Sequence, residues 1–225
     1  MFKKIVIASA VLIAAMSANA QSTVTLGGTI NPPSCDLVMT TSKAVYGDMS
    51  ANTIKGYTPI LIGGLNYYKL SAKKIDYTLK CDAPVKVELA FSDSNAGKAS
   101  YSSTGSEWAV VDASGTSVGY AVLDSTSYTL NSNAVAVPVG VVVAAPVGTT
   151  TWGTTFGTGG LFSAAYVAPG YAFGFSPFVN STVPNQVSAI DGAFNITPFL
   201  KKSYVDAATS IFSIALSGTI TLQYL

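Results

Sequence analysis

Much of the chain consists of short segments in which apolar and polar residues alternate, the pattern of a β-strand with one buried and one exposed face. In one of these segments Ile75, Tyr77, Leu79 and Cys81 share a face. Gly, Pro, Asn and Asp separate the segments, whereas stretches with a helical period and helix-end signals are scarce. The pattern predicts an all-β fold, a sandwich or barrel of many short strands.

Residues 85–91 alternate in the same way and carry Lys86, Glu88 and Ala90 on their less apolar face. We expect this second face to be solvated, as in an antiparallel sheet that covers a core from one side. Residues 22–30 form another candidate strand, which the two following prolines would end.

The last segment keeps its alternation to the penultimate residue, although chain ends usually fray and become polar. Its other face is small or polar throughout. Its apolar face consists of Phe212, Ile214, Leu216, Gly218, Ile220, Leu222 and Tyr224. We expect these seven residues to face one apolar interior.

The first twenty residues have the pattern of a secretory signal peptide. Lys3 and Lys4 form a short basic start, residues 5–15 are apolar, and small residues surround the expected cleavage site between Ala20 and Gln21. The alternative is a buried N-terminal helix. Cleavage predicts export through the inner membrane, no stable membrane span afterwards, and one domain over residues 21–225.

The charge balance argues against a nucleic-acid partner. All 12 basic residues of the chain are lysines, and there are 11 acidic residues and no histidine. Two of the lysines belong to the expected leader, so the exported chain is close to neutral. It shows no basic cluster, and it lacks the planar guanidinium groups that commonly bind phosphate.

Cys35 and Cys81 are the two cysteines of the chain. In an exported protein an even number of cysteines predicts a disulfide. Closing a loop of this length stabilises the fold by about 4 kcal/mol in the loop-entropy model. The alternative is a pair of buried free thiols, and two cysteines without histidine make a poor zinc site.

The sequence favours a protein that is not an enzyme and binds no metal or cofactor. Without histidine the common hydrolytic triads and most general bases near neutral pH are missing. Residues 115–119 match the Gly-x-Ser-x-Gly pattern around a hydrolase nucleophile, here Ser117. That motif needs a strand-to-helix turn and a histidine partner. The acidic residues have no calcium-loop spacing.

Residues 125–190 contain no charged side chain and are rich in Ala, Val, Gly, Thr and aromatic residues. Prolines and glycines interrupt the most apolar part, which argues against a membrane helix. The segment is interpreted either as buried strands with uncharged loops or as a surface that faces a partner.

Five sequence blocks carry a resemblance to a known family. They are residues 28–35, 46–50, 77–84, 85–93 and 95–97. They resemble a family of secreted, fimbria-associated proteins described as probable major subunits of β-fimbriae, and more broadly they are similar to pilins of the chaperone–usher pathway. The resemblance covers residues 26–98 well and the last strand moderately, whereas residues 99–205 match in composition alone. Its most specific element is the Cys-Asp-Ala-Pro run at Cys81.

The resemblance implies a pilin-type, immunoglobulin-like β-sandwich that lacks its final strand. In such proteins the C-terminal strand borders an open groove, which a periplasmic chaperone fills before another subunit replaces it by strand addition, at an outer-membrane usher. By this resemblance residues 212–222 match the groove strand that pairs with the chaperone, and Tyr224 matches the penultimate aromatic residue. Cys35 and Cys81 match the bridge between the first two strands.

The candidate donor segment contains Val24 and Leu26. If residues 28–34 form the first strand, only residues 21–27 remain as a free extension, whereas a donor usually needs about ten residues at roughly 3.3 Å each. Pilins also often carry a glycine about a dozen residues before the penultimate aromatic, and here Gly218 lies closer. A fibre-capping subunit and a self-complemented fold therefore remain alternatives.

Other functions compete with that of a structural fimbrial subunit. A tip or adhesin-like protein of the same system would use the aromatic residues Trp152, Tyr166, Tyr171 and Phe175 to contact a ligand. A small outer-membrane β-barrel would explain the alternating strands and the uncharged middle. The expected location is the periplasm and then a cell-surface fimbrium.

Overall fold

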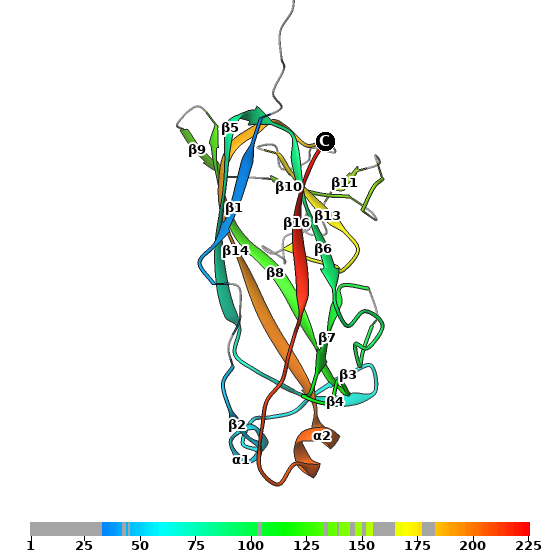
Figure 1. The fold of residues 1–225 in the computed structure, drawn as a ribbon. Helices are drawn as coiled ribbons and strands as arrows, with labels where there is room; N and C mark the ends of the chain where they lie inside the picture. Colours follow the sequence, from blue (N-terminus) through cyan, green and yellow to red (C-terminus); the bar gives the residue numbers. More distant parts are fainter. Residues whose placement is uncertain are drawn as a thin grey trace, which may run out of the picture. The chain divides into compact units, whose positions relative to one another are not determined.

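Antiparallel strands dominate the structure, a computed structural model, so the predicted all-β sandwich is confirmed (Figure 1). Residues Pro33–Leu225 belong to one compact unit. The expected cleavage site at Ala20 and Gln21 and the candidate donor residues Val24 and Leu26 lie outside the described residues. The structure describes residues 33–41, 44, 46–102, 105–132, 135–138, 140–144, 147–149, 152–154, 165–176 and 183–225.

The larger sheet runs in the order β1–β5–β14–β4–β3, with the long strand β14 near its centre. Strand β14 also pairs with β8, and β8 pairs with β7, β9 and β12. Their bounds are β1 Cys35–Met39, β3 Ile60–Ile62, β4 Leu65–Lys69, β5 Lys73–Val85, β7 Glu107–Val111, β8 Ser117–Ser132, β9 Val135–Pro138, β12 Ala165–Tyr166 and β14 Val187–Lys201. Along this order β1 is the terminal strand.

The smaller sheet runs in the order β11–β10–β13–β6–β16, so that the C-terminal strand is also terminal. Its bounds are β6 Val87–Asp93, β10 Gly140–Ala144, β11 Trp152–Thr154, β13 Ala172–Ser176 and β16 Gly218–Tyr224. Lys86 alone separates β5 from β6, so one stretch of chain passes from the larger sheet to the smaller.

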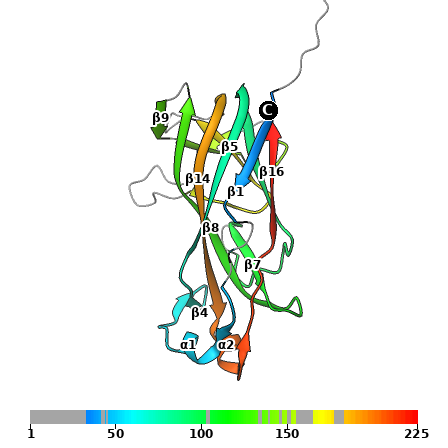
Figure 2. The same cartoon turned by 60° about the vertical axis from the view of Figure 1, so that its left-hand side comes forward.

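A third, two-stranded sheet and two short helices lie at the opposite end of the unit from the C-terminus (Figures 1 and 2). The bounds are β2 Met49–Ser50, β15 Ile211–Phe212, α1 Ala51–Lys55 and α2 Lys202–Ala207. Strand β2 precedes α1 directly, and β15 follows α2 after a short loop, so these elements connect the first strands of the chain to its tail.

Aromatic side chains from both sheets form the centre of the core. Phe91 on β6 meets Phe194 on β14 edge to face, with 5.5 Å between the ring centroids, and Tyr77 on β5 stacks on Phe194 at 4.6 Å. Burying each of these side chains contributes roughly 1.5 to 3 kcal/mol. The alternation predicted for β5 is confirmed, because Ile75, Tyr77, Leu79 and Cys81 are buried and Thr78 and Lys80 are exposed.

The prediction that β6 has a solvated face is wrong. Glu88 and Ala90 are only 3% and 6% exposed. The indole ring of Trp152 packs against Ala90, and it also lies beside Gly174 of the neighbouring strand β13. A segment distant in sequence therefore covers the face that the alternation alone assigned to solvent.

The sequence predicts residues 125–190 to be either buried strands with uncharged loops or an exposed surface, and the described part of them contains both kinds of residue. All five residues of β13 are buried, as expected for core strands without charge. By contrast Val147, Tyr166 and Val183 are 38 to 54% exposed. The described part of this region is therefore neither wholly core nor wholly a surface.

Candidate functional site: an open groove between the first and last strands

An apolar groove of about 610 Å³ lies between the early part of the chain and its C-terminal tail. Trp108, Phe194 and Ile196 from the larger sheet contribute to its lining, together with Met39 and Tyr46 on the early side. The tail contributes the side chains of Ile214, Leu216 and Ile220.

The tail has the alternation that the sequence predicted, but its apolar face is only half-buried. Phe212, Ile214, Leu216, Ile220 and Leu222 pack against the core while each stays partly exposed. Tyr224 is 50% exposed, and every residue of the opposite face except Gln223 is exposed. A row of large apolar side chains with solvent on part of its surface is what a missing neighbour would leave.

Gly218 interrupts this apolar row because a larger residue there would collide with Trp108. A Cβ atom at residue 218 would lie 2.4 Å from the indole ring of Trp108. Trp108 is 2% exposed, and its indole nitrogen donates a hydrogen bond of 2.7 Å to the carbonyl of Val167. The indole therefore occupies the space next to the backbone that a side chain at residue 218 would need.

The free edge of the tail can be derived from its hydrogen bonds. Ser217 accepts from the amide of Ser94, and the amide of Leu225 donates to Lys86, at 2.9 and 3.0 Å. Ala215 exchanges two backbone hydrogen bonds with Val111. Main-chain groups alternate sides along a strand. Odd-numbered tail residues therefore bond to β6 and β7, and even-numbered residues from 214 to 224 direct theirs to the groove side.

Strand β1 presents a second free edge by the same reasoning. The amide of Asp82 donates to Ser34, and the amide of Thr40 donates to Asp76, both at 2.9 Å. These bonds fix which residues of β1 bond to β5. The amides and carbonyls of Cys35, Leu37 and Met39 point to the other side, where the described residues supply no strand.

The predicted disulfide between Cys35 and Cys81 is confirmed, and it holds this edge in place. The two residues are directly opposite each other in the register of β1 and β5, with 4.0 Å between their Cα atoms. No described cysteine is free. The disulfide therefore keeps β1 on the larger sheet, while no described strand covers its other edge.

Two contacts join the early chain to the tail on either side of the residues that line the groove. At one end the hydroxyl of Tyr224 accepts a hydrogen bond of 2.8 Å from the amide of Cys35. At the other end Phe212 pairs with Met49 in the small sheet of β15 and β2. Between these contacts the structure pairs no described residue of the early chain with the tail.

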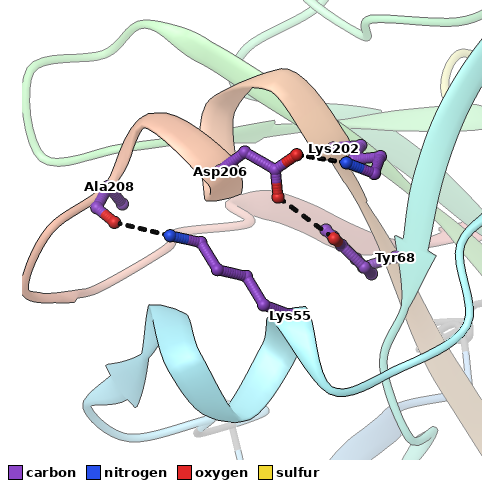
Figure 3. Close-up of polar contacts among 5 residues, drawn as sticks. All are labelled: Lys55, Tyr68, Lys202, Asp206 and Ala208. Carbon is purple, nitrogen blue, oxygen red and sulfur yellow. Dashed lines mark hydrogen bonds and ion pairs between the residues drawn. The ribbon is translucent and has the colours of Figure 1, made fainter.

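A polar cluster fixes the start of the tail at the helical end of the unit (Figure 3). Lys55 at the end of α1 donates to the carbonyl of Ala208 at 3.1 Å. Asp206 forms an ion pair with Lys202 and accepts from the hydroxyl of Tyr68 at 3.1 Å. The ammonium of Lys202 is the main cause that lowers the pKa of Asp206. These contacts position β15 and the segment that follows it.

The groove is almost free of charge. Asp48 is the charged residue of its described lining, and it is exposed. The Tyr46 hydroxyl donates to the carbonyl of Ile196 at 2.8 Å, and burial raises the pKa of Tyr46 to about 12. Such a surface suits an extended apolar segment, which would bring its own backbone donors and acceptors.

The described residues show no arrangement for metal or nucleophilic chemistry. Among them no group of three or more His, Cys, Asp or Glu residues is placed to hold a metal ion. Ser117 follows a turn and begins a strand, so residues 115–119 do not form the strand-to-helix turn of a hydrolase nucleophile. Within the described part of the chain no helix is long and apolar enough to cross a membrane.

The four aromatic residues considered for ligand contact do not form one exposed surface. Phe175 is fully buried in the core, so its assignment as a contact residue is wrong. Trp152 packs on Ala90 and covers the smaller sheet. Tyr166 is the exposed member, at 38%.

Sequence reasoning missed the position of the first strand and the early side of the groove. The first described strand begins at Cys35, directly after the residues expected to form it. Cys35, Leu37 and Met39 alternate with Asp36 and Val38, and this pattern is a usable signal. The signal is weak because a segment of only five residues offers few positions in which to detect the alternation. Comparisons with protein-family models, curated proteins and solved structures gave no match.

Proposed function

We propose that this protein is a structural subunit of a bacterial surface fimbria, assembled by strand addition through a periplasmic chaperone and an outer-membrane usher. The observation that carries the proposal is the groove, beside which two strand edges that no described strand covers accompany half-buried apolar side chains. In this proposal the fold is an immunoglobulin-like sandwich without its last strand.

The occupant that fits this groove best is an extended peptide segment. Even-numbered residues of the tail and alternate residues of β1 offer backbone donors and acceptors to it, as in other complexes formed by strand addition. Side chains on one face of the segment would complete the core beside Ile220 and Leu222. Six tail residues whose main-chain groups pair with no described strand, from Ile214 to Tyr224, cover a length of roughly 35 Å.

An unfilled groove of this kind is an aggregation hazard. Free strand edges pair with other chains, and half-buried apolar side chains add to the attraction. A periplasmic chaperone that fills the groove until assembly would remove the hazard. This is the physical reason to expect a chaperone and an usher as partners, together with other subunits.

The position of β1 supports a longer donor segment than residues 21–27. Ser34 is the first described residue that bonds to β5, and the thirteen residues 21–33 precede it; in extended form they reach roughly 40 Å. Val24, Leu26 and Ile30 alternate with the period of the groove residues. We propose that this segment fills the groove of a second subunit.

The test compares donor variants that carry the same charge on opposite faces. Val24→Asp with Leu26→Asp places two carboxylates on the apolar face, and Thr23→Asp with Thr25→Asp places two on the polar face. Residues 21–225 are produced in the periplasm with a pilus chaperone, and fibres are counted by electron microscopy after shearing. We expect fibres from the unchanged chain and the threonine variant, and none from the other variant. Equal fibre yields from both variants would contradict the proposed donor.

A further inference from the structure

We propose that Tyr224 acts as a latch. In an unfilled subunit its side chain bridges the last and first described strands at one end of the groove, and this bridge breaks when a strand enters. The inference rests on the proposed function, because it concerns the regulation of the same groove. Its basis is the hydrogen bond of 2.8 Å that crosses from the last strand to the first, between residues 189 positions apart in the sequence.

The latch occupies a backbone donor that an incoming strand needs. Cys35 belongs to the residues of β1 whose amides point away from β5. A strand that pairs along β1 would take this amide as one of its hydrogen-bond donors. The phenol hydroxyl and the incoming backbone carbonyl therefore compete for one N–H group, and only one of them can hold it.

The phenol also lies in the path of the incoming strand. Tyr224 pairs with Val87, so its backbone is fixed at the end of β16, while its side chain reaches the other edge of the opening. A side chain that connects both edges fills the space into which the end of a docking strand has to move. Strand entry at this end therefore requires rotation of the Tyr224 side chain.

The surroundings make release of the latch easy. The Tyr224 side chain is 50% exposed, so it can rotate into solvent without leaving a buried cavity. The disulfide holds Cys35 on β5, so the amide stays in place when the phenol leaves. Docking exchanges one hydrogen bond to this amide for another, so the latch slows entry and weakens binding only modestly.

The test measures the binding of a labelled peptide with the sequence of residues 21–34 to the chain of residues 21–225. Tyr224→Phe keeps the ring and removes the hydroxyl. Tyr57→Phe is the matched control, because Tyr57 is 43% exposed and its hydroxyl has no hydrogen-bond partner in the described residues. We expect Tyr224→Phe to increase the association rate about threefold to tenfold, with an unchanged dissociation rate. Tyr57→Phe should leave both rates unchanged.

Amide hydrogen exchange at Cys35 gives a second readout that needs no peptide. Without the hydroxyl we expect this amide to exchange several-fold faster, while the amides of β5 keep their protection. Equal association rates together with unchanged exchange at Cys35 would overturn the latch and leave the groove as a binding site. Absence of peptide binding to every protein, Tyr224→Phe included, would overturn the proposed donor and the latch together. Failure of Tyr224→Phe to fold would also overturn the latch, since a latch is dispensable to the fold.

Discussion

Glu88 and Gln223 lie directly opposite each other on β6 and β16, on the face of the smaller sheet that points away from the groove. Glu88 is 3% exposed and makes no hydrogen bond or ion pair with the described residues. Burial raises the pKa of its carboxyl group. Residues 125–190, which include the covering Trp152, supply no cation to compensate for the charge.

This arrangement predicts that the fold becomes more stable as the pH falls into the mildly acidic range. The folded state holds the Glu88 proton more tightly than the unfolded state, so ionisation above the ordinary glutamate pKa destabilises the fold. Stability from this residue is therefore gained as the pH falls through the raised pKa towards the ordinary one. Each unit by which the pKa is raised corresponds to about 1.4 kcal/mol.

Glu88→Gln isolates this effect. Urea unfolding at pH 7 and pH 5 should show a higher midpoint for the variant at pH 7 and a smaller difference between variant and unchanged protein at pH 5. Asp82→Asn, which changes an exposed carboxylate in the same part of the chain, serves as the control. The interpretation is wrong if Glu88→Gln lowers the midpoint at pH 7.

The buried position of Glu88 also shows which part of the fold the sequence pattern cannot predict. Alternation correctly places Leu89 and Phe91 in the core, because the period of a strand is a local property. It cannot show that Trp152 will cover the other face, because that contact joins segments more than sixty residues apart. The charge of Glu88 predicts exposure to solvent, yet the residue is buried, and the described residues place no ion-pair partner beside it.

The tail could be predicted more completely than the early side of the groove. Its alternation extends over seven positions, so the half-buried row from Phe212 to Tyr224 is visible in the sequence. The Tyr224–Cys35 hydrogen bond is not visible, since it depends on where two sheet edges meet. Likewise the pairing of β15 with β2 follows from the helices that bring them together.

The disulfide predicts a measurable loss of stability on its removal. Replacing Cys35 and Cys81 together by serine releases the cross-link and should lower the free energy of unfolding by about 2 to 4 kcal/mol. Because β1 has only five residues, its amides should lose more exchange protection than those of β14. Urea unfolding and amide exchange measure the two effects.

A control experiment tests the pairing itself. Thiol labelling of the denatured, unreduced protein should find no free thiol. Quantitative labelling of both cysteines would contradict the disulfide.

Gly218→Ala should destabilise the protein although the change is one methyl group. The new Cβ atom would lie 2.4 Å from the buried indole of Trp108 and 2.8 Å from the carbonyl oxygen of Ser92. Overpacking of this kind typically costs about 1 to 3 kcal/mol. Gly56→Ala is the control, because residue 56 has an ordinary right-handed backbone and its Cβ would meet no atom closer than 3.2 Å. Similar unfolding midpoints for both variants would argue against a rigid Trp108.

The two faces of the tail predict opposite outcomes for neighbouring charges. Leu222 is half-buried, packs against the core and lies opposite Leu89, whereas Thr221 is exposed. An aspartate at residue 222 would have to lose hydration against the apolar core, which disfavours its charged form. We therefore expect Leu222→Asp to lower the yield of soluble protein or chaperone complex at least tenfold, and Thr221→Asp to lower it little.

The comparison of these two variants tests the register of β16, because a shift by one residue exchanges the two faces of a strand. Yields are measured in periplasmic extracts at equal expression, with and without a pilus chaperone. If both variants are recovered equally, the tail does not border a groove that a partner strand completes. If Thr221→Asp is the more damaging change, the register is shifted, and the odd-numbered residues face the core.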